Sequence, residues 1–140
     1  MNFFDTNVLI AASIPSHPHY EACSARLNRL RQSGGACAAH TMAEAYSTLT
    51  NLTRGYSIPP ADAFQILEEA STIFTLVTLT AKEFMRALKG ASEKDLRGGI
   101  VYDALLVACA RKVEARWVFT NNYKHIRRIA PDLASRIIEP

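Results

Sequence analysis

Three acidic residues stand in segments where carboxylates are unusual. Asp5 directly follows an apolar strand predicted over residues 2–4, and Glu44 follows a small-residue strand predicted over residues 36–39. Asp103 is the only charged residue in the apolar segment 100–110. A charge in so apolar a segment costs free energy unless it is paired, hydrogen-bonded or bound to a metal ion. The three positions therefore make these acids candidates for a shared chemical role.

Each acid also has a structural interpretation. Asp5 could cap the helix that follows it, and Glu44 could close a capping box with Thr41. Asp103 could stabilise a helix N-terminus through the helix dipole. Taken together, however, all three are expected to project from strand-to-helix junctions toward one edge of a sheet, where they would repel one another without a cation. Oxygen ligands of this kind suit Mg²⁺ or Mn²⁺.

A fourth polar position follows the strand predicted over residues 117–120. Thr120, Asn121 and Asn122 place a hydroxyl group and two amides there. An amide can orient a water molecule or a ligand of a metal ion, although it carries no charge. The alternative is an ordinary Asn-Asn turn, and the sequence leaves open whether Asn121 or Asn122 faces the acids.

Basic residues gather in the same part of the chain. Residues 111–128 carry a net charge of +5, whereas the whole chain carries +3, so the remainder sums to −2. The basic residues of this segment are Arg111, Lys112, Arg116, Lys124, Arg127 and Arg128. They could contact phosphate groups in a salt-dependent way, with Tyr123 and His125 stacking on an unpaired base. The alternative is a solvated helix face.

Alternating strands and helices are predicted to position these residues. The predicted strands cover residues 2–4, 36–39, 73–79, 117–120 and 136–138. The predicted helices cover residues 8–12, 20–32, 41–52, 60–70, 80–88, 101–114 and 124–129, with a loop over 54–60. This alternation indicates an α/β fold whose mostly parallel sheet has helices on both faces. In such folds the functional site lies at the carboxyl ends of the strands.

Length and composition narrow the class of protein. The chain has 140 residues, of which 49% are hydrophobic and 21% charged, and these values exclude a disordered chain and a coiled coil. We expect one domain over residues 1–140. No apolar run approaches the ~18 residues of a membrane span, and the opening residues do not resemble a secretory leader. Since the three cysteines form no CxxC pair and the four histidines no HExxH motif, we expect a cytoplasmic protein without a histidine-rich metal site.

Four segments resemble the motifs of the PIN domain family. Residues 4–10 resemble the first motif, residues 42–46 around Glu44 the second, residues 99–110 the third and residues 119–126 the fourth. Many members of the family have Asp where Asn122 stands here. The closest resemblance is to the VapC-type toxins of bacterial toxin–antitoxin pairs. It implies a metal-dependent ribonuclease with a three-layer sandwich fold, in which helices cover both faces of a parallel sheet of four to five strands.

The resemblance also implies roles for individual residues and for partners. Asp5, Glu44 and Asp103 would be catalytic and would hold one or two Mg²⁺ or Mn²⁺ ions, with Asn122 at the fourth position. Glu44 would complete the metal shell or accept a proton from the attacking water, while Thr6 and Thr120 would hydrogen-bond the ligands or the phosphate. The implied partners are an RNA substrate, a second copy of the chain and an antitoxin that covers helix faces over residues 20–30 or 63–67.

Two other classes of function remain open at this point. In a phosphoaspartyl phosphatase Asp5 would be a nucleophile, although such enzymes carry a second acid two residues later, where Asn7 stands here. In a non-catalytic RNA- or protein-binding module the acids would cap helices, and the basic segment would hold RNA or an acidic partner.

Overall fold

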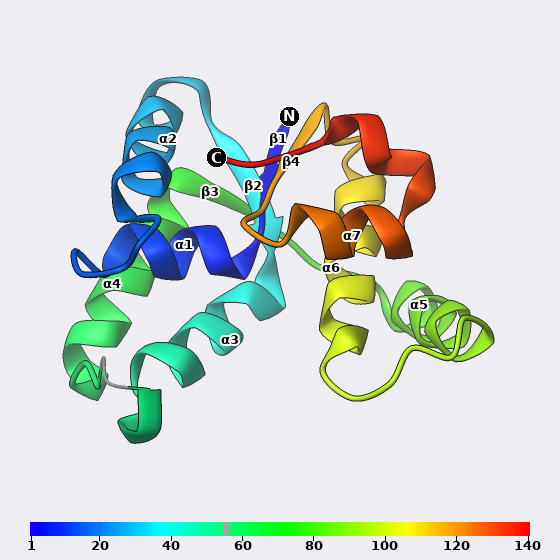
Figure 1. Cartoon of the computed structure of the whole chain (residues 1–140), viewed down its shortest axis with the longest axis horizontal. Helices are drawn as coiled ribbons and strands as arrows, with labels where there is room; N and C mark the ends of the chain where they lie inside the picture. The colour runs from blue at the N-terminus through cyan, green and yellow to red at the C-terminus, as the bar shows by residue number, and fades with distance from the viewer. Residues whose placement is uncertain (55–56) are drawn as a thin grey trace.

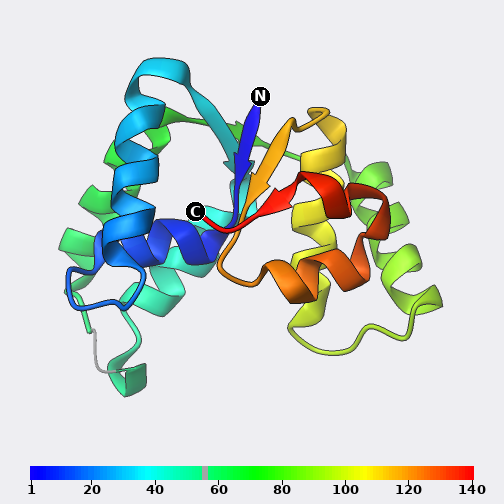
Figure 2. The same cartoon turned by 45° about the horizontal axis from the view of Figure 1, so that its top comes forward.

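A parallel β-sheet forms the centre of the computed structural model, which describes residues 1–54 and 57–140. Within these residues the sheet has five strands in the order β3-β2-β1-β4-β5, and every neighbouring pair is parallel. The strands are β1 (Asn2–Phe4), β2 (Gly35–Ala38), β3 (Phe74–Val77), β4 (Trp117–Phe119) and β5 (Ile137–Ile138). The first strand in the sequence therefore lies in the middle of the sheet, as Figure 2 shows.

Helices cover both faces of this sheet (Figure 1). They are α1 (Thr6–Ser13), α2 (Tyr20–Ser33), α3 (Ala39–Leu49), α4 (Pro60–Ile73), α5 (Ala81–Glu93), α6 (Ile100–Lys112) and α7 (Tyr123–Ile129), with short 3-10 helices η1 (Leu52–Arg54) and η2 (Pro131–Arg136). Helices α1, α2 and α4 bury side chains in one core, and α6, α7 and η2 bury side chains in the other. The predicted three-layer α/β fold with a parallel sheet is therefore confirmed.

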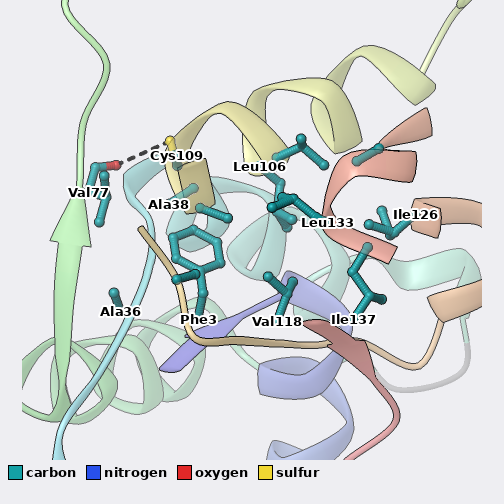
Figure 3. Close-up of a cluster of buried hydrophobic side chains, with 14 of the residues drawn as sticks. Phe3, Ala36, Ala38, Val77, Leu106, Cys109, Val118, Ile126, Leu133 and Ile137 are labelled. Carbon is teal, nitrogen blue, oxygen red and sulfur yellow. Dashed lines mark hydrogen bonds between the residues drawn. The ribbon is translucent and has the colours of Figure 1, made fainter. Parts of the chain in front are cut away.

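Two adjacent phenylalanines of β1 anchor the two cores. Phe3 lies on the face covered by α6, where Leu106, Val118 and other apolar side chains surround it (Figure 3). Phe4 points to the opposite face and stacks on Phe119, with ring centroids 4.8 Å apart. Both phenylalanine side chains are almost fully buried. Burial on both faces explains why β1 has two consecutive apolar residues instead of an alternation of apolar and polar ones, as is typical of central strands in parallel sheets.

Local signals in the sequence explain where two of the helices end or begin. Helix α2 ends at Ser33, and Gly34 follows it with a φ of 67°, in the left-handed region that glycine adopts without strain. Helix α5 begins with a capping box: the main-chain N–H of Glu83 donates to Oγ1 of Thr80, and that of Thr80 donates to the Glu83 carboxylate. The three cysteines are buried and free.

Other local predictions are wrong. Thr41 and Glu44 do not form a capping box, since α3 already begins at Ala39 with no side-chain cap and ends at Leu49. Helix α5 continues to Glu93, past residue 88, where the sequence predicted its end. The loop predicted over residues 54–60 lies partly outside the described residues.

Of the helices in the described ranges, none has the length and apolar character that crossing a membrane requires.

Candidate active site

The three acids singled out in the sequence line one cavity of about 600 Å³. Asp5 follows β1 directly, Glu44 lies in the second turn of α3, which follows β2, and Asp103 lies in the first turn of α6. The expectation that Asp103 follows a strand is wrong, because α6 comes after α5 and a loop. Its amino end reaches the same edge of the sheet because α6 runs back toward the start of β4. The cavity therefore lies at the carboxyl edge, where parallel sheets hold their sites.

Asp5 is held by groups from distant parts of the chain. Its side chain is 5% exposed, and Oδ2 accepts hydrogen bonds from Thr120 Oγ1 at 2.6 Å and from Asn7 Nδ2 at 2.7 Å. Its main-chain N–H donates to the carbonyl of Phe119 at 3.0 Å. The carboxylate makes no capping hydrogen bond to α1. Asp5 is thus fixed across β1 and β4 instead of serving its own helix.

The environment of Asp5 disfavours its ionised form. The pKa of Asp5 is raised from 3.8 to about 6, chiefly because the carboxyl group is buried. The hydrogen bond from Thr120 lowers this pKa, while the negative charges of Asp103 and Glu44 raise it further. Asp5 is therefore the acid of the cavity on which the negative charges of the other two act.

Glu44 is tied to α1. The hydroxyl group of Thr6 donates to Oε2 of Glu44 at 2.6 Å. The hydroxyl oxygen of Thr6 also lies 3.2 Å from that of Thr41, and both threonines are buried. Thr41, which the sequence suggested as a helix cap, instead supports the residue that orients Glu44.

Asp103 contacts a histidine of the basic segment 111–128. Nε2 of His125 in α7 lies 3.1 Å from Oδ2 of Asp103. Burial raises the pKa of Asp103, the positive charge of a protonated His125 lowers it, and Glu44 raises it. His125, which the sequence offered as a residue that could stack on an unpaired base, thus lies against an acid of the site. Only the tertiary fold brings residues 103 and 125 together, so no local pattern could reveal this pair.

His40 is a residue of the cavity that no motif in the sequence indicated. Its half-buried ring lines the cavity and lies against the ring of Tyr102, with centroids 6.4 Å apart. Burial lowers the pKa of His40, while the charge of Glu44 and the backbone of Tyr102 raise it. In the described part of the chain, Nε2 of His40 is the one buried side-chain nitrogen or oxygen without a hydrogen-bond partner.

The two asparagines after β4 are not equivalent. Asn121 turns toward α1 and α2: its main-chain N–H donates to Oδ1 of Asn7, and its amide donates to the carbonyl of Asn7 and contacts Cys23. Asn122 is exposed, and its main-chain N–H donates to Oγ1 of Thr120 at 2.9 Å. Asn7, which the sequence reading used only to argue against a phosphatase, lines the cavity and bonds Asp5.

The six basic residues of the segment 111–128 do not share one position relative to the acids. Arg111 and Lys112 end α6 and pair with Asp132 and Glu83, at 2.6 and 2.7 Å. From Asp103 to Arg111 the helix rises roughly 12 Å. Arg116 precedes β4, at the opposite edge of the sheet from the acids. Lys124, Arg127 and Arg128 belong to α7, the helix that also carries His125.

The donor set fits a hard divalent cation in kind. Three carboxylates with neighbouring hydroxyl and amide oxygens are the ligand types that Mg²⁺ and Mn²⁺ accept, and a cation would offset the repulsion that raises the pKa of Asp5. The side chains are not arranged as a metal site in this structure: among the described residues, no group of three His, Cys, Asp or Glu side chains could hold a metal ion. Thr6, Thr120 and His125 occupy carboxylate oxygens instead.

Comparisons with known proteins agree with this architecture. The model of the PIN domain family matches residues 3–130. Two relatives from Mycobacterium tuberculosis are Ribonuclease VapC40, 32% identical over 112 residues and 80% of each chain, and Ribonuclease VapC27, 31% identical over 79% of this chain and 77% of its own. The crystal structure of VapC20 from the same organism, a sarcin–ricin loop cleaving toxin, matches 89% of this chain and 93% of its own, with a TM-score of 0.70 at 19% identity. The chain therefore belongs to the PIN domain family.

Proposed function

We propose that this protein is an Mg²⁺- or Mn²⁺-dependent endoribonuclease that hydrolyses phosphodiester bonds in RNA. The observation that carries the proposal is that Asp5, Glu44 and Asp103, from three separate segments, line one cavity. The relatives named as ribonucleases support RNA as the substrate. The likeness of the fold to that of a toxin is consistent with a role as the toxin of a toxin–antitoxin pair.

The acids have separable tasks in this proposal. Asp5 and Asp103 would hold the cation, which would neutralise charge on the reacting phosphate and lower the pKa of the attacking water. Glu44 would either complete the set of oxygen ligands of the cation or accept the proton from the attacking water. The hydrogen bond from Thr6 orients the Glu44 carboxylate for either task. Thr120 and His125 position Asp5 and Asp103. We keep Asn122 as the proposed fourth catalytic position on the resemblance to the family; its main-chain N–H donates to the Thr120 hydroxyl group, while its side chain is exposed and outside the residues that line the cavity.

The RNA backbone is proposed to cross α7. This helix carries Lys124, Arg127 and Arg128, which are exposed, and it contacts Asp103 through His125. Arg127 already donates to the carbonyl of Ile137, which fixes its position on the surface. Arg111, Lys112 and Arg116 lie farther from the acids. Their proposed contribution is long-range attraction of phosphate, which salt screens.

Cleavage assays test the proposed activity. The purified protein is incubated with a panel of structured RNAs and Mg²⁺ or Mn²⁺, and the ends of the products are mapped. We expect cleavage that EDTA abolishes, and loss of cleavage in Asp103→Asn. Asp62→Asn, at an exposed position of α4, is the matched control and should cleave normally. Wild-type rates in Asp103→Asn would contradict the assignment.

The same assays separate the other classes of function. RNA binding without cleavage under any metal condition would favour a non-catalytic binding module. Release of phosphate from small phosphomonoesters would favour a phosphoaspartyl phosphatase, in which Asp5 is the nucleophile, if beryllofluoride inhibits that release.

The proposed toxin role implies partners that can be isolated. Co-purification with the product of the adjacent reading frame tests for an antitoxin, and restored cell growth on its co-expression tests its effect. A second copy of the chain is also a proposed partner. Exposed apolar side chains such as Phe84 and Met85 on α5, 40% and 63% exposed, offer a surface for it. A molar mass near 15.5 kDa in light scattering would contradict the dimer.

A further inference from the structure

The cavity that holds the acids continues beyond them along α3. His40, Glu44, Ser47 and Thr48 all line it, and their spacing of three and four residues places them on one face of the helix. Its volume of about 600 Å³ falls in the range of pockets that enclose a small ligand, roughly 300–1,000 Å³. The cavity thus has room beside the reacting phosphate.

The wall beside Asp103 is aromatic. Tyr102 precedes Asp103 in α6, lines the cavity and is 50% exposed. The His40 ring lies behind it at a tilt of 38°, with centroids 6.4 Å apart, which is within the range of favourable aromatic pairs. Tyr102 therefore has an aromatic neighbour in His40 and is exposed enough at the cavity to contact a ligand.

The remaining walls combine hydroxyl groups with apolar surface. Ser47 and Thr48 present hydroxyl groups that can donate or accept hydrogen bonds, and Ile10 of α1 contributes an aliphatic side chain. An aromatic platform beside hydrogen-bonding groups is the chemistry by which proteins hold unpaired nucleobases.

We propose that this cavity is a subsite for the unpaired nucleobase next to the cleaved phosphodiester bond. Tyr102 is the stacking platform, His40 supports its ring, and Ser47 and Thr48 contact the edge of the base. Because Tyr102 is adjacent to Asp103, a phosphate held by the acids places the neighbouring base beside the ring. The subsite rests on the proposed ribonuclease function, to which it adds a preference for certain bases at one position.

Binding of short oligonucleotides tests the subsite without requiring cleavage. The probes are fluorescein-labelled hexamers of A, C and U, titrated with protein in Ca²⁺ and followed by anisotropy. We expect Tyr102→Ala to weaken binding roughly 5- to 100-fold, as removal of a stacking ring does, and Tyr102→Phe to retain wild-type affinity. Ser47→Ala combined with Thr48→Val should reduce the differences in affinity among the three hexamers.

Tyr46→Ala is the matched control. Tyr46 lies on α3, the helix of His40, Ser47 and Thr48, and like Tyr102 it is partly exposed, at 39%. It is not among the residues that line this cavity. Its variant should bind each hexamer as the wild type does. If Tyr102→Ala binds all hexamers with wild-type affinity and ranking, or if the wild type binds none, the subsite is wrong.

Cleavage mapping distinguishes failure of the subsite from failure of the proposed function. If the wild type cleaves RNA and Tyr102→Ala cleaves at the same rate and with the same base preference, the ribonuclease function stands and the subsite falls. If no RNA is cleaved, but Tyr102→Ala still loses affinity and Tyr102→Phe restores it, the subsite stands and hydrolysis falls.

Discussion

Replacing Asp5 with Asn should stabilise the metal-free protein at neutral pH while abolishing cleavage. The Asp5 carboxyl group is buried beside Asp103 and Glu44, and its pKa is raised from 3.8 to about 6. Ionising it in the folded state therefore costs more than ionising it in the unfolded chain. Asn resembles the neutral form, and its side-chain oxygen can still accept the hydrogen bond from Thr120.

The size of the effect follows from the pKa of Asp5. One pKa unit corresponds to 1.36 kcal/mol, so a rise from 3.8 to about 6 amounts to about 3 kcal/mol. Because the folded pKa lies above the unfolded one, the stabilisation by neutral Asp5 is complete below pH 3.8 and is lost as the pH rises through about 6. The advantage of Asp5→Asn should thus be small near pH 4 and approach about 3 kcal/mol at pH 8.

Urea unfolding in EDTA at several pH values between 4 and 8 measures this difference. The free energies of unfolding of the wild type, Asp5→Asn and the exposed control Asp62→Asn are compared at each pH. The control should follow the wild type. Adding Mg²⁺ should stabilise the wild type more than Asp5→Asn, because a ligand that binds the folded state raises its stability by mass action.

Two results would refute the reasoning. If Asp5→Asn is less stable than the wild type at pH 8, the hydrogen bonds to the ionised carboxylate outweigh its burial. If the difference between the two proteins is the same at pH 4 and pH 8, the pKa of Asp5 is not raised in the folded state.

Three further predictions concern the surroundings of the acids and the core. Thr120→Val removes a buried hydroxyl group that donates to Asp5 and should lower the free energy of unfolding by about 1–3 kcal/mol; unchanged urea unfolding would contradict this. Leu106→Ala, in the core of Figure 3, should cost about 2–5 kcal/mol in the same measurement, and a loss below about 1 kcal/mol would show that the core collapses around it. Arg127→Glu combined with Arg128→Glu should weaken RNA binding most at low salt and flatten its salt dependence. An unchanged slope would exclude α7 from the RNA path.

The sequence predicted the position of the acids better than their contacts. Asp5, Glu44 and Asp103 could be found because each interrupts an apolar or small-residue segment near a predicted strand or helix end. The alternation of strands and helices then predicted the parallel sheet and its carboxyl edge. These features are local or periodic, and one sequence records them directly.

The contacts could not be predicted, because they join residues far apart in the chain. Thr41 and Glu44 have the spacing of a capping box, as Thr80 and Glu83 do, but only the second pair forms one. Thr6 competes for the Glu44 carboxylate from another helix, and this competition is invisible in the motif. The same limit applies to His125, whose contact with Asp103 depends on how α6 and α7 cross.

The central place of β1 has a consequence for synthesis of the protein. Asp5 is synthesised 115 residues before Thr120, whose hydroxyl group holds it, and β4 must pair with β1 before that contact forms. Contacts of such long sequence separation form late, since the intervening chain must close around them. A nascent or truncated chain that ends before residue 120 lacks the hydroxyl group that holds Asp5, one of the proposed catalytic acids. If the protein is a ribonuclease, it is active only after Thr120 has been synthesised and β4 has paired with β1.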